Sequence, residues 1–185
     1  MVKAQGDETT LRVLTVNTGM LSDITVQTPG GQIAYDGDAR IDGVPGTAAP
    51  VRIRFLDTEG SVAGSLLPTG RAKDVFDIEG FGKLEATCID NGMPMVLLRA
   101  EDVQRTAYES VADMNADTEL KSILEKLRLQ AALAMGLGDV SQKNYPKMCL
   151  LNQPLHGGAV HTRCFIPHVC HDAIGVLAAI TVATA

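Results

Sequence analysis

Aromatic side chains are scarce in this sequence, and tryptophan is absent. The 185 residues include only three tyrosines and four phenylalanines. Proteins that bind single-stranded nucleic acid stack bases on aromatic side chains, and this chain offers few of them. Basic residues are also outnumbered, with 16 lysines and arginines against 22 aspartates and glutamates and a net charge of −6. Because phosphate backbones and anionic lipids attract basic patches, we predict neither a nucleic-acid nor a membrane partner.

Long apolar segments are missing as well. The most apolar segment is the end of the chain, residues 173–185, which is shorter than the about 20 residues that cross a bilayer. The first ten residues, MVKAQGDETT, contain no apolar region of the kind found in secretory signals. Four cysteines at irregular spacing are typical of reduced thiols, so we expect a cytoplasmic protein.

Short β-branched segments separated by turn residues predict a chain rich in β-strands. Residues 1–10 are polar and are expected to be frayed. Glycine, proline and aspartate predict a loop at residues 36–50. We predict strands at residues 11–18, 24–28, 32–35, 51–56, 84–89, 95–99, 147–151 and 159–166. The second and third of these would form a hairpin across the sequence Pro29-Gly30-Gly31.

One amphipathic helix is predicted after Asp117, which is a suitable N-cap. Gly136 or Gly138 would end it. Charged residues between the apolar positions, including Glu125 and Arg128, are expected to face solvent. The apolar positions recur at helical spacing and are Leu120, Ile123, Leu124, Leu127 and Ala131.

The end of the chain predicts a second helix of a different kind. From residue 173 onward it is apolar on every face, which indicates a helix enclosed by the rest of the fold. Asp172 is a candidate N-cap, and Gly175 would let a ligand approach the backbone. Free amides at a helix start attract anions. The expected fold class is therefore α+β, with one curled, mostly antiparallel, barrel-like sheet around a buried central helix.

Cysteine and histidine crowd into the segment before that helix, at Cys164, His168, Cys170 and His171. Zinc sites usually pair such ligands at C-x2–4-C spacing with a second pair elsewhere, and this segment has neither feature. We therefore predict a polar turn with buried thiols and no metal. Cys170 and His171 are the candidates for catalysis, since a helix N-terminus lowers the pKa of a thiol, although core packing is the commoner role of cysteine. No phosphate-binding glycine loop, GxSxG or HExxH motif is present.

Two turns and one lysine have alternative interpretations. The backbone and side chain of Asn91, Gly92 and Met93 could grip a carboxylate, or could form an ordinary turn. The turn that ends in Thr69 and Gly70 has the same two interpretations. Lys147 could pair with an acidic ligand or could be solvated.

Six ordered motifs make the chain resemble a known family. They are NTG at 17–19, IDGVPG at 41–46, LLPTG at 66–70, CIDNGMP at 88–94, LGDVSQKNYPK at 137–147 and FIPHVCHDAIGV at 165–176. In this order they resemble the PrpF-like isomerases, and the branch they resemble most is that of 4-oxalomesaconate tautomerase. The resemblance covers nearly the whole chain from Leu11 onward.

The resemblance implies a diaminopimelate-epimerase-like fold of two lobes, each a curled sheet around a central helix. It also implies an isomerase that works without a cofactor, moving a double bond in an unsaturated di- or tricarboxylic acid by proton transfer. The segment from His171 through Ala173, Ile174 and Gly175, and the Asn91 turn, match positions that would bind the substrate carboxylates. Thr69, Gly70 and Lys147 complete the expected substrate-binding set.

The chain departs from the family in length. Members are about twice as long, and their first lobe carries GGTSKG-like and CGN segments that supply the acid–base lysine and cysteine. Neither segment occurs here. We therefore expect residues 11–185 to be a single C-terminal-type lobe, truncated at its end and inactive alone. The alternative is a non-catalytic carboxylate-binding or self-associating remnant. A half-covered apolar helix would also favour a homodimer.

Overall fold

The structure is a computed structural model that describes residues 2–16, 19–41 and 43–185. The chain divides into two compact units, Met1–Thr58 and Glu59–Ala185. The predicted turn at Asn17 and Thr18 lies outside the described residues, as does Asp42 of the IDGVPG motif.

The first unit is built on a three-stranded antiparallel sheet. Its strands are β1 (Glu8–Leu14), β2 (Leu21–Gln27) and β3 (Arg52–Leu56), in the order β1-β2-β3. Polar cross-strand pairs stabilise one face, where Thr10 bonds Thr25 and Arg12 bonds Asp23. β1 begins at Glu8, so the last residues of the segment expected to be frayed belong to a strand.

The hairpin predicted across Pro29-Gly30-Gly31 is wrong. These residues form a 3-10 turn (Pro29–Gly31), and residues 32–35 form no strand. A single backbone bond, from Ala34 N to Gln27 O, joins the two sides. Gly30 and Gly31 both adopt positive φ, and β2 takes β3 as its second partner instead. Local turn signals do not encode this pairing, whose partners run from Thr25 with Arg52 to Leu21 with Leu56.

The second unit contains a five-stranded sheet in the order β4-β5-β6-β7-β8. Only β6 and β7 are parallel, so the sheet is mostly antiparallel as predicted. β4 and β8 are its two outermost strands and do not pair with each other, so the sheet is open rather than barrel-like. The strands are β4 (Asp74–Ile78), β5 (Gly82–Asp90), β6 (Pro94–Arg99), β7 (Lys147–Asn152) and β8 (His161–Phe165).

A helical crossover joins the two parallel strands, as parallel pairing requires. It contains a 3-10 turn (Ala100–Val103), α1 (Val111–Ala116) and α2 (Thr118–Ala134). The predicted N-cap is confirmed, because the Asp117 carboxylate accepts a hydrogen bond from Leu120 N. Gly136 follows the helix with a φ of 72°, where only glycine is unstrained. β4 and α1 were not predicted; α1 is a six-residue helix capped by Ser110.

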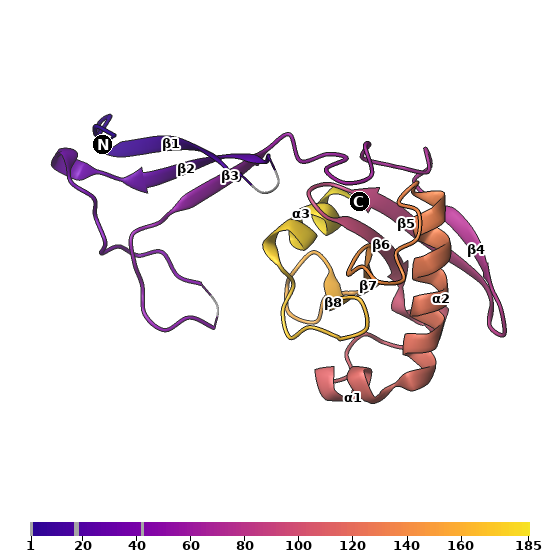
Figure 1. Cartoon of the computed structure of the whole chain (residues 1–185). Helices are drawn as coiled ribbons and strands as arrows, with labels where there is room; N and C mark the ends of the chain where they lie inside the picture. Colours follow the sequence, from indigo (N-terminus) through magenta and orange to yellow (C-terminus); the bar gives the residue numbers. More distant parts are fainter. Residues whose placement is uncertain (1, 17–18, 42) are drawn as a thin grey trace. The chain divides into compact units, whose positions relative to one another are not determined.

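The sheet of this unit is covered on both faces (Figure 1). β6 is the centre of the packing: Val96 and Leu98 join the core under α1 and α2, whereas Met95 and Leu97 join a second core under the last helix, α3 (Val176–Thr184). A strand buried on both faces reads as a continuous apolar run, and MVLL at residues 95–98 does so.

The prediction of a buried central helix is wrong. α3 begins at Val176, and only Ala178 and Thr181 on it are buried, while Val176 is 65% exposed. Asp172 does not cap it; the N-cap is Gly175, which makes no side-chain capping bond. The helix packs one face on the sheet and no described element covers the other face within this unit. α2 buries one face more fully than α3 does, through seven buried residues that include Leu120, Leu127 and Ala131, as its amphipathic pattern predicts. No helix in the described part of the chain has the length and apolar character to span a membrane.

Candidate functional site

Three of the motif segments meet at one edge of the five-stranded sheet. β6 and β7 run parallel with Met95 opposite Lys147, so both strands begin at this edge. β5 ends there, since Asp90 lies opposite Pro94, and β8 also ends there, since Phe165 lies opposite Met148. The segments that flank these strand ends are the Asn91 turn, the Lys147 approach and the loop after Phe165.

The buried carboxylate of Asp90 holds the loop that faces this edge. Asp90 is completely buried. Its Oδ2 accepts hydrogen bonds from Val62 N (2.7 Å) and Ala63 N (2.8 Å), and its Oδ1 accepts one from Ser61 Oγ (2.9 Å). Its backbone N donates to Leu66 O at 2.9 Å. Asp90 therefore connects the LLPTG segment to the Asn91 turn. This role was not predicted from the sequence.

A second buried carboxylate organises the LLPTG turn itself. Thr69 Oγ1 donates to Asp74 Oδ2 at 2.6 Å, and Arg71 Nε donates to Asp74 Oδ1 at 2.8 Å. Gly70 closes the turn with a φ of 73° and donates its N–H to Leu67 O. The hydroxyl of Thr69 is thus directed at Asp74. The groups of this turn that could bind a ligand are therefore those of its backbone.

The LGDVSQKNYPK segment is anchored from α2 by a fully buried arginine. Arg128 pairs with Glu125 through two bonds, at 2.7 and 2.8 Å. Its Nη1 donates to the carbonyls of Val140, Lys143 and Tyr145. The expectation that Arg128 faces solvent is therefore wrong: its charge compensates the carbonyls of the loop that leads into Lys147, and a guanidinium has enough donors to do so.

The Asn91 turn contacts the last turn of α3. Thr181 Oγ1 donates to Asn91 O (2.8 Å) and to Met93 O (3.1 Å), and Asn91 Nδ2 donates to Thr184 Oγ1 (2.8 Å). Gly92 between them has a φ of 87°. The start of α3 lies at the other end of this helix, six to nine residues away, or about 9 to 13 Å at 1.5 Å per residue.

The predicted site residues from His171 to Gly175 follow β8. The chain turns at residues 166–169 and returns, so that Cys170 pairs with Phe165 and His171 N donates to Cys164 O at 2.9 Å. His171, Ala173 and Gly175 are exposed, and Ile174 packs partly into the second core. The Asn91 turn and Lys147 therefore lie at the same edge of the sheet. Thr69 and Gly70 lie in the loop before β4, whose first residue Asp74 is opposite Ala86 of β5. The residues from His171 to Gly175 lead into the start of α3.

The thiol of Cys170 is not activated by a helix N-terminus. It is buried, its backbone is held by Asn115, and burial raises its pKa. Burial likewise raises the pKa of Cys88 to about 12. Both thiols have the character of core packing.

The cysteine and histidine cluster does not converge. His168 lies 3.6 Å from Glu125, and His171 is exposed, while the Cys164 thiol faces Cys149. Among residues 2–16, 19–41 and 43–185, no group of three or more His, Cys, Asp and Glu side chains is arranged to hold a metal ion.

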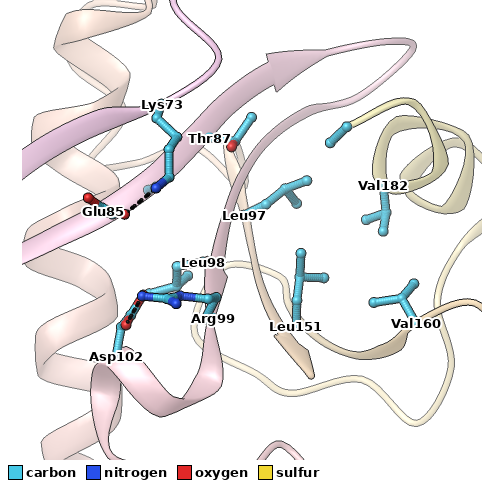
Figure 2. Close-up of a pocket in the computed structure, with 12 residues that line it drawn as sticks. Lys73, Glu85, Thr87, Leu97, Leu98, Arg99, Asp102, Leu151, Val160 and Val182 are labelled. Atoms are coloured by element: carbon cyan, nitrogen blue, oxygen red, sulfur yellow. Dashed lines mark hydrogen bonds and ion pairs between the residues drawn. The ribbon is translucent and has the colours of Figure 1, made fainter. Parts of the chain in front are cut away.

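A pocket of about 380 Å³ opens beside the C-terminal end of α3. Figure 2 shows its two ion pairs, Lys73 with Glu85 and Arg99 with Asp102, facing an apolar wall that includes Leu151. These four charges cancel, so the pocket has no excess positive charge for a polycarboxylate. None of the predicted site residues lines it, and Arg99 is the last residue of β6, at the opposite end from the Asn91 turn.

The sequence model of the PrpF protein family matches residues 1–185. The chain belongs to the PrpF family. It is 52% identical to the 4-oxalomesaconate tautomerase of Pseudomonas putida and 51% identical to the (4E)-oxalomesaconate Delta-isomerase of Novosphingobium sp. strain KA1, both over 185 residues, all of this chain and 50% of each relative.

A solved structure supports the fold. The crystal structure of methylitaconate-delta-isomerase matches with a TM-score of 0.85 at 27% identity, over 97% of this chain and 51% of that one. The chain therefore spans about half the length of the relatives that it matches. These PrpF relatives are isomerases of carboxylic acids, and their names include isomerases of 3-methylitaconate and 2-methyl-aconitate.

Proposed function

We propose that this PrpF chain is the carboxylate-binding half of an isomerase that moves a double bond in an unsaturated di- or tricarboxylic acid resembling 4-oxalomesaconate. The reaction transfers a proton from one carbon to another and needs no cofactor. The observation that carries the proposal is the identity of more than 50%, over the whole chain, to two relatives that are both named for oxalomesaconate. The relatives named for methylitaconate and methylaconitate are only 31% and 32% identical over shorter stretches.

The two groups of residues at the sheet edge and at the start of α3 would serve different carboxylates of the substrate. The first amides of α3 have no intrahelical acceptor, and Gly175 supplies no side chain to cap them. They suit one carboxylate, with the neighbouring His171 exposed beside them. A second carboxylate would contact Lys147 and the Asn91 turn. Because the Asn91 turn and the start of α3 lie at opposite ends of a nine-residue helix, a single small carboxylate cannot bridge them.

The proton-transfer pair is the part of the mechanism that this chain does not supply in our proposal. A proton shift needs one group that removes an activated C–H proton and another that returns it. Burial raises the pKa of Cys170 and so disfavours its thiolate. We assign both steps to the part of the parent enzyme that corresponds to the other half of the relatives, and we place the enzyme in the cytoplasm.

Proton exchange tests this assignment. The purified chain is incubated with 4-oxalomesaconate in D2O, deuterium incorporation is followed by NMR, and circular dichroism confirms folding. We expect binding, detected by calorimetry, without exchange. Lys147→Met should weaken binding by about ten- to hundred-fold, the value of one charge-assisted hydrogen bond. The matched control Lys83→Met, an exposed lysine on β5, should leave binding unchanged.

Three outcomes separate the possibilities. Binding without exchange supports a carboxylate-binding half. Exchange that requires the chain shows that it carries its own acid–base pair, which supports the isomerase and overturns the assignment of both steps elsewhere. A folded chain that neither binds nor exchanges overturns the proposal and favours the alternative of a self-associating remnant without the activity.

A further inference from the structure

Two cysteines that the proposed function does not use lie directly opposite each other on neighbouring strands. Cys149 of β7 pairs in register with Cys164 of β8. Their Sγ atoms are 3.0 Å apart, and both side chains are buried in the core under α3. Opposed residues of an antiparallel pair have Cα atoms about 4.5 to 5.5 Å apart, within the range that a disulfide spans. A bond between these sulfurs therefore needs no movement of the backbone.

The two thiols differ in pKa and in exposure because their surroundings differ. The hydrogen bond between the sulfurs and the nearby ammonium of Lys147 lower the pKa of Cys164, while the same sulfur contact and burial raise the pKa of Cys149. Lys147 lies two residues before Cys149 and so shares its face of β7. Cys164 is also the more accessible, at 5% exposure against 0% for Cys149. The thiolate is the nucleophilic form of cysteine, so Cys164 is the sulfur that reacts first.

We propose that Cys149 and Cys164 form a redox-active dithiol, a modification site that a peroxide oxidises to a disulfide between β7 and β8. The Cys164 thiolate attacks one peroxide oxygen, and the O–O bond breaks to leave a sulfenic acid on Cys164 and hydroxide, which takes up a proton as water. The Cys149 sulfur then attacks the Cys164 sulfur, and the S–O bond breaks to release a second water. The two thiols lose two electrons and two protons in total, and hydrogen peroxide is reduced to two waters.

In this proposal peroxide reaches the pair at the start of α3. Ile174 and Ala178 cover the second core there, and the adjoining Gly175 and Val176 are exposed. The hydroxyl contacts that fix α3 come from Thr181 and Thr184, at its other end. Local opening of the first turn of α3 would then expose the core that contains Cys164 without unfolding the sheet.

Peptide mapping tests the dithiol. The reduced chain is treated with hydrogen peroxide, its free thiols are alkylated in denaturant, and the protein is digested with trypsin without reduction. Cleavage after Lys147 and Arg163 places Cys149 and Cys164 on different peptides. We expect two of the four thiols to be lost and one cross-linked peptide pair, residues 148–163 with residues 164–185, that dithiothreitol separates.

Matched variants identify the sulfurs, because Cys170 lies on the same peptide as Cys164. The double variant Cys88→Ser, Cys170→Ser should still form the cross-link, whereas Cys149→Ser and Cys164→Ser should each abolish it. Circular dichroism checks the fold of each variant, and tandem mass spectrometry of the wild-type cross-linked pair locates the bond on Cys164 or Cys170 if a variant fails to fold. The proposal is overturned if Cys149 and Cys164 stay as alkylatable as Cys88, if the cross-link requires Cys170, or if Cys164 gains oxygen without any cross-link.

Discussion

The buried carboxylate of Asp90 provides the sharpest test of how the candidate site is held together. Asp90 accepts three hydrogen bonds from the loop at residues 61–63, two of them from backbone N–H groups. Replacing it with alanine removes all three acceptors at once. A hydrogen bond to a charged group contributes about 1.5 to 3 kcal/mol. Ser61 and Val62 are exposed, so water can replace part of what is lost. We expect Asp90→Ala to lower the free energy of unfolding by about 3 kcal/mol.

The isosteric variant separates the loss of charge from the loss of contacts. In Asp90→Asn the amide oxygen can take the place of Oδ2 and accept from Val62 and Ala63, while the amide nitrogen donates to the Ser61 hydroxyl. All three contacts are kept and only the charge is lost, so a cost of about 1 kcal/mol is expected. Asp77→Ala, an exposed aspartate on β4, should change stability by less than about 0.5 kcal/mol.

Urea unfolding, followed by circular dichroism at the helical band, measures these changes in unfolding free energy for the unit that contains Asp90. All three α-helices of the described chain belong to the unit Glu59–Ala185, which contains Asp90. The signal therefore reports that unit and not the three-stranded sheet. An alanine variant within 0.5 kcal/mol of the parent, or an asparagine variant as unstable as the alanine variant, would refute the reasoning.

Four further predictions follow from the structure. Arg128→Met, which leaves three loop carbonyls and Glu125 without their donor, should destabilise the chain by about 3 to 5 kcal/mol in the same assay; a loss below 1 kcal/mol contradicts the anchoring role. The bond from Arg105 lowers the pKa of Asp117, so the stabilisation from this N-cap is present above its unfolded pKa of about 3.9 and is lost as pH falls through the lower folded value. The difference in unfolding free energy between the parent and Asp117→Ala, about 1 kcal/mol at pH 7, should therefore shrink below pH 4. A difference that widens on acidification contradicts the prediction. Oxidation of the dithiol closes a loop of 15 residues and should raise the free energy of unfolding by about 3 kcal/mol, measured by comparing peroxide-treated and reduced samples. Light scattering after size exclusion should show a dimer that Val176→Asp, placed on the exposed face of α3, converts to a monomer; a monomeric parent contradicts the association.

Local sequence signals determined the elements that depend on nearby residues. The N-cap at Asp117, the spacing of the apolar residues in α2, and the strands β5, β6, β7 and β8 follow from capping, periodicity and β-branched composition. The ordered motifs also identified the PrpF family, which the match of the family model to residues 1–185 confirms. The CIDNGMP and LGDVSQKNYPK motifs lie at the ends of strands that were predicted at residues 84–89, 95–99 and 147–151.

Tertiary structure decided what each of these segments contacts. The apolar sequence of α3 predicted enclosure, but which of its faces is covered depends on elements far away in the chain. Arg128 has the composition of a surface residue and is buried because three carbonyls of a distant loop meet its guanidinium. The opposition of Cys149 and Cys164 is likewise a matter of strand register, which a shift of one residue would abolish. Propensity and capping act over a few residues, whereas register and burial depend on which segments pair, and only the folded chain specifies that.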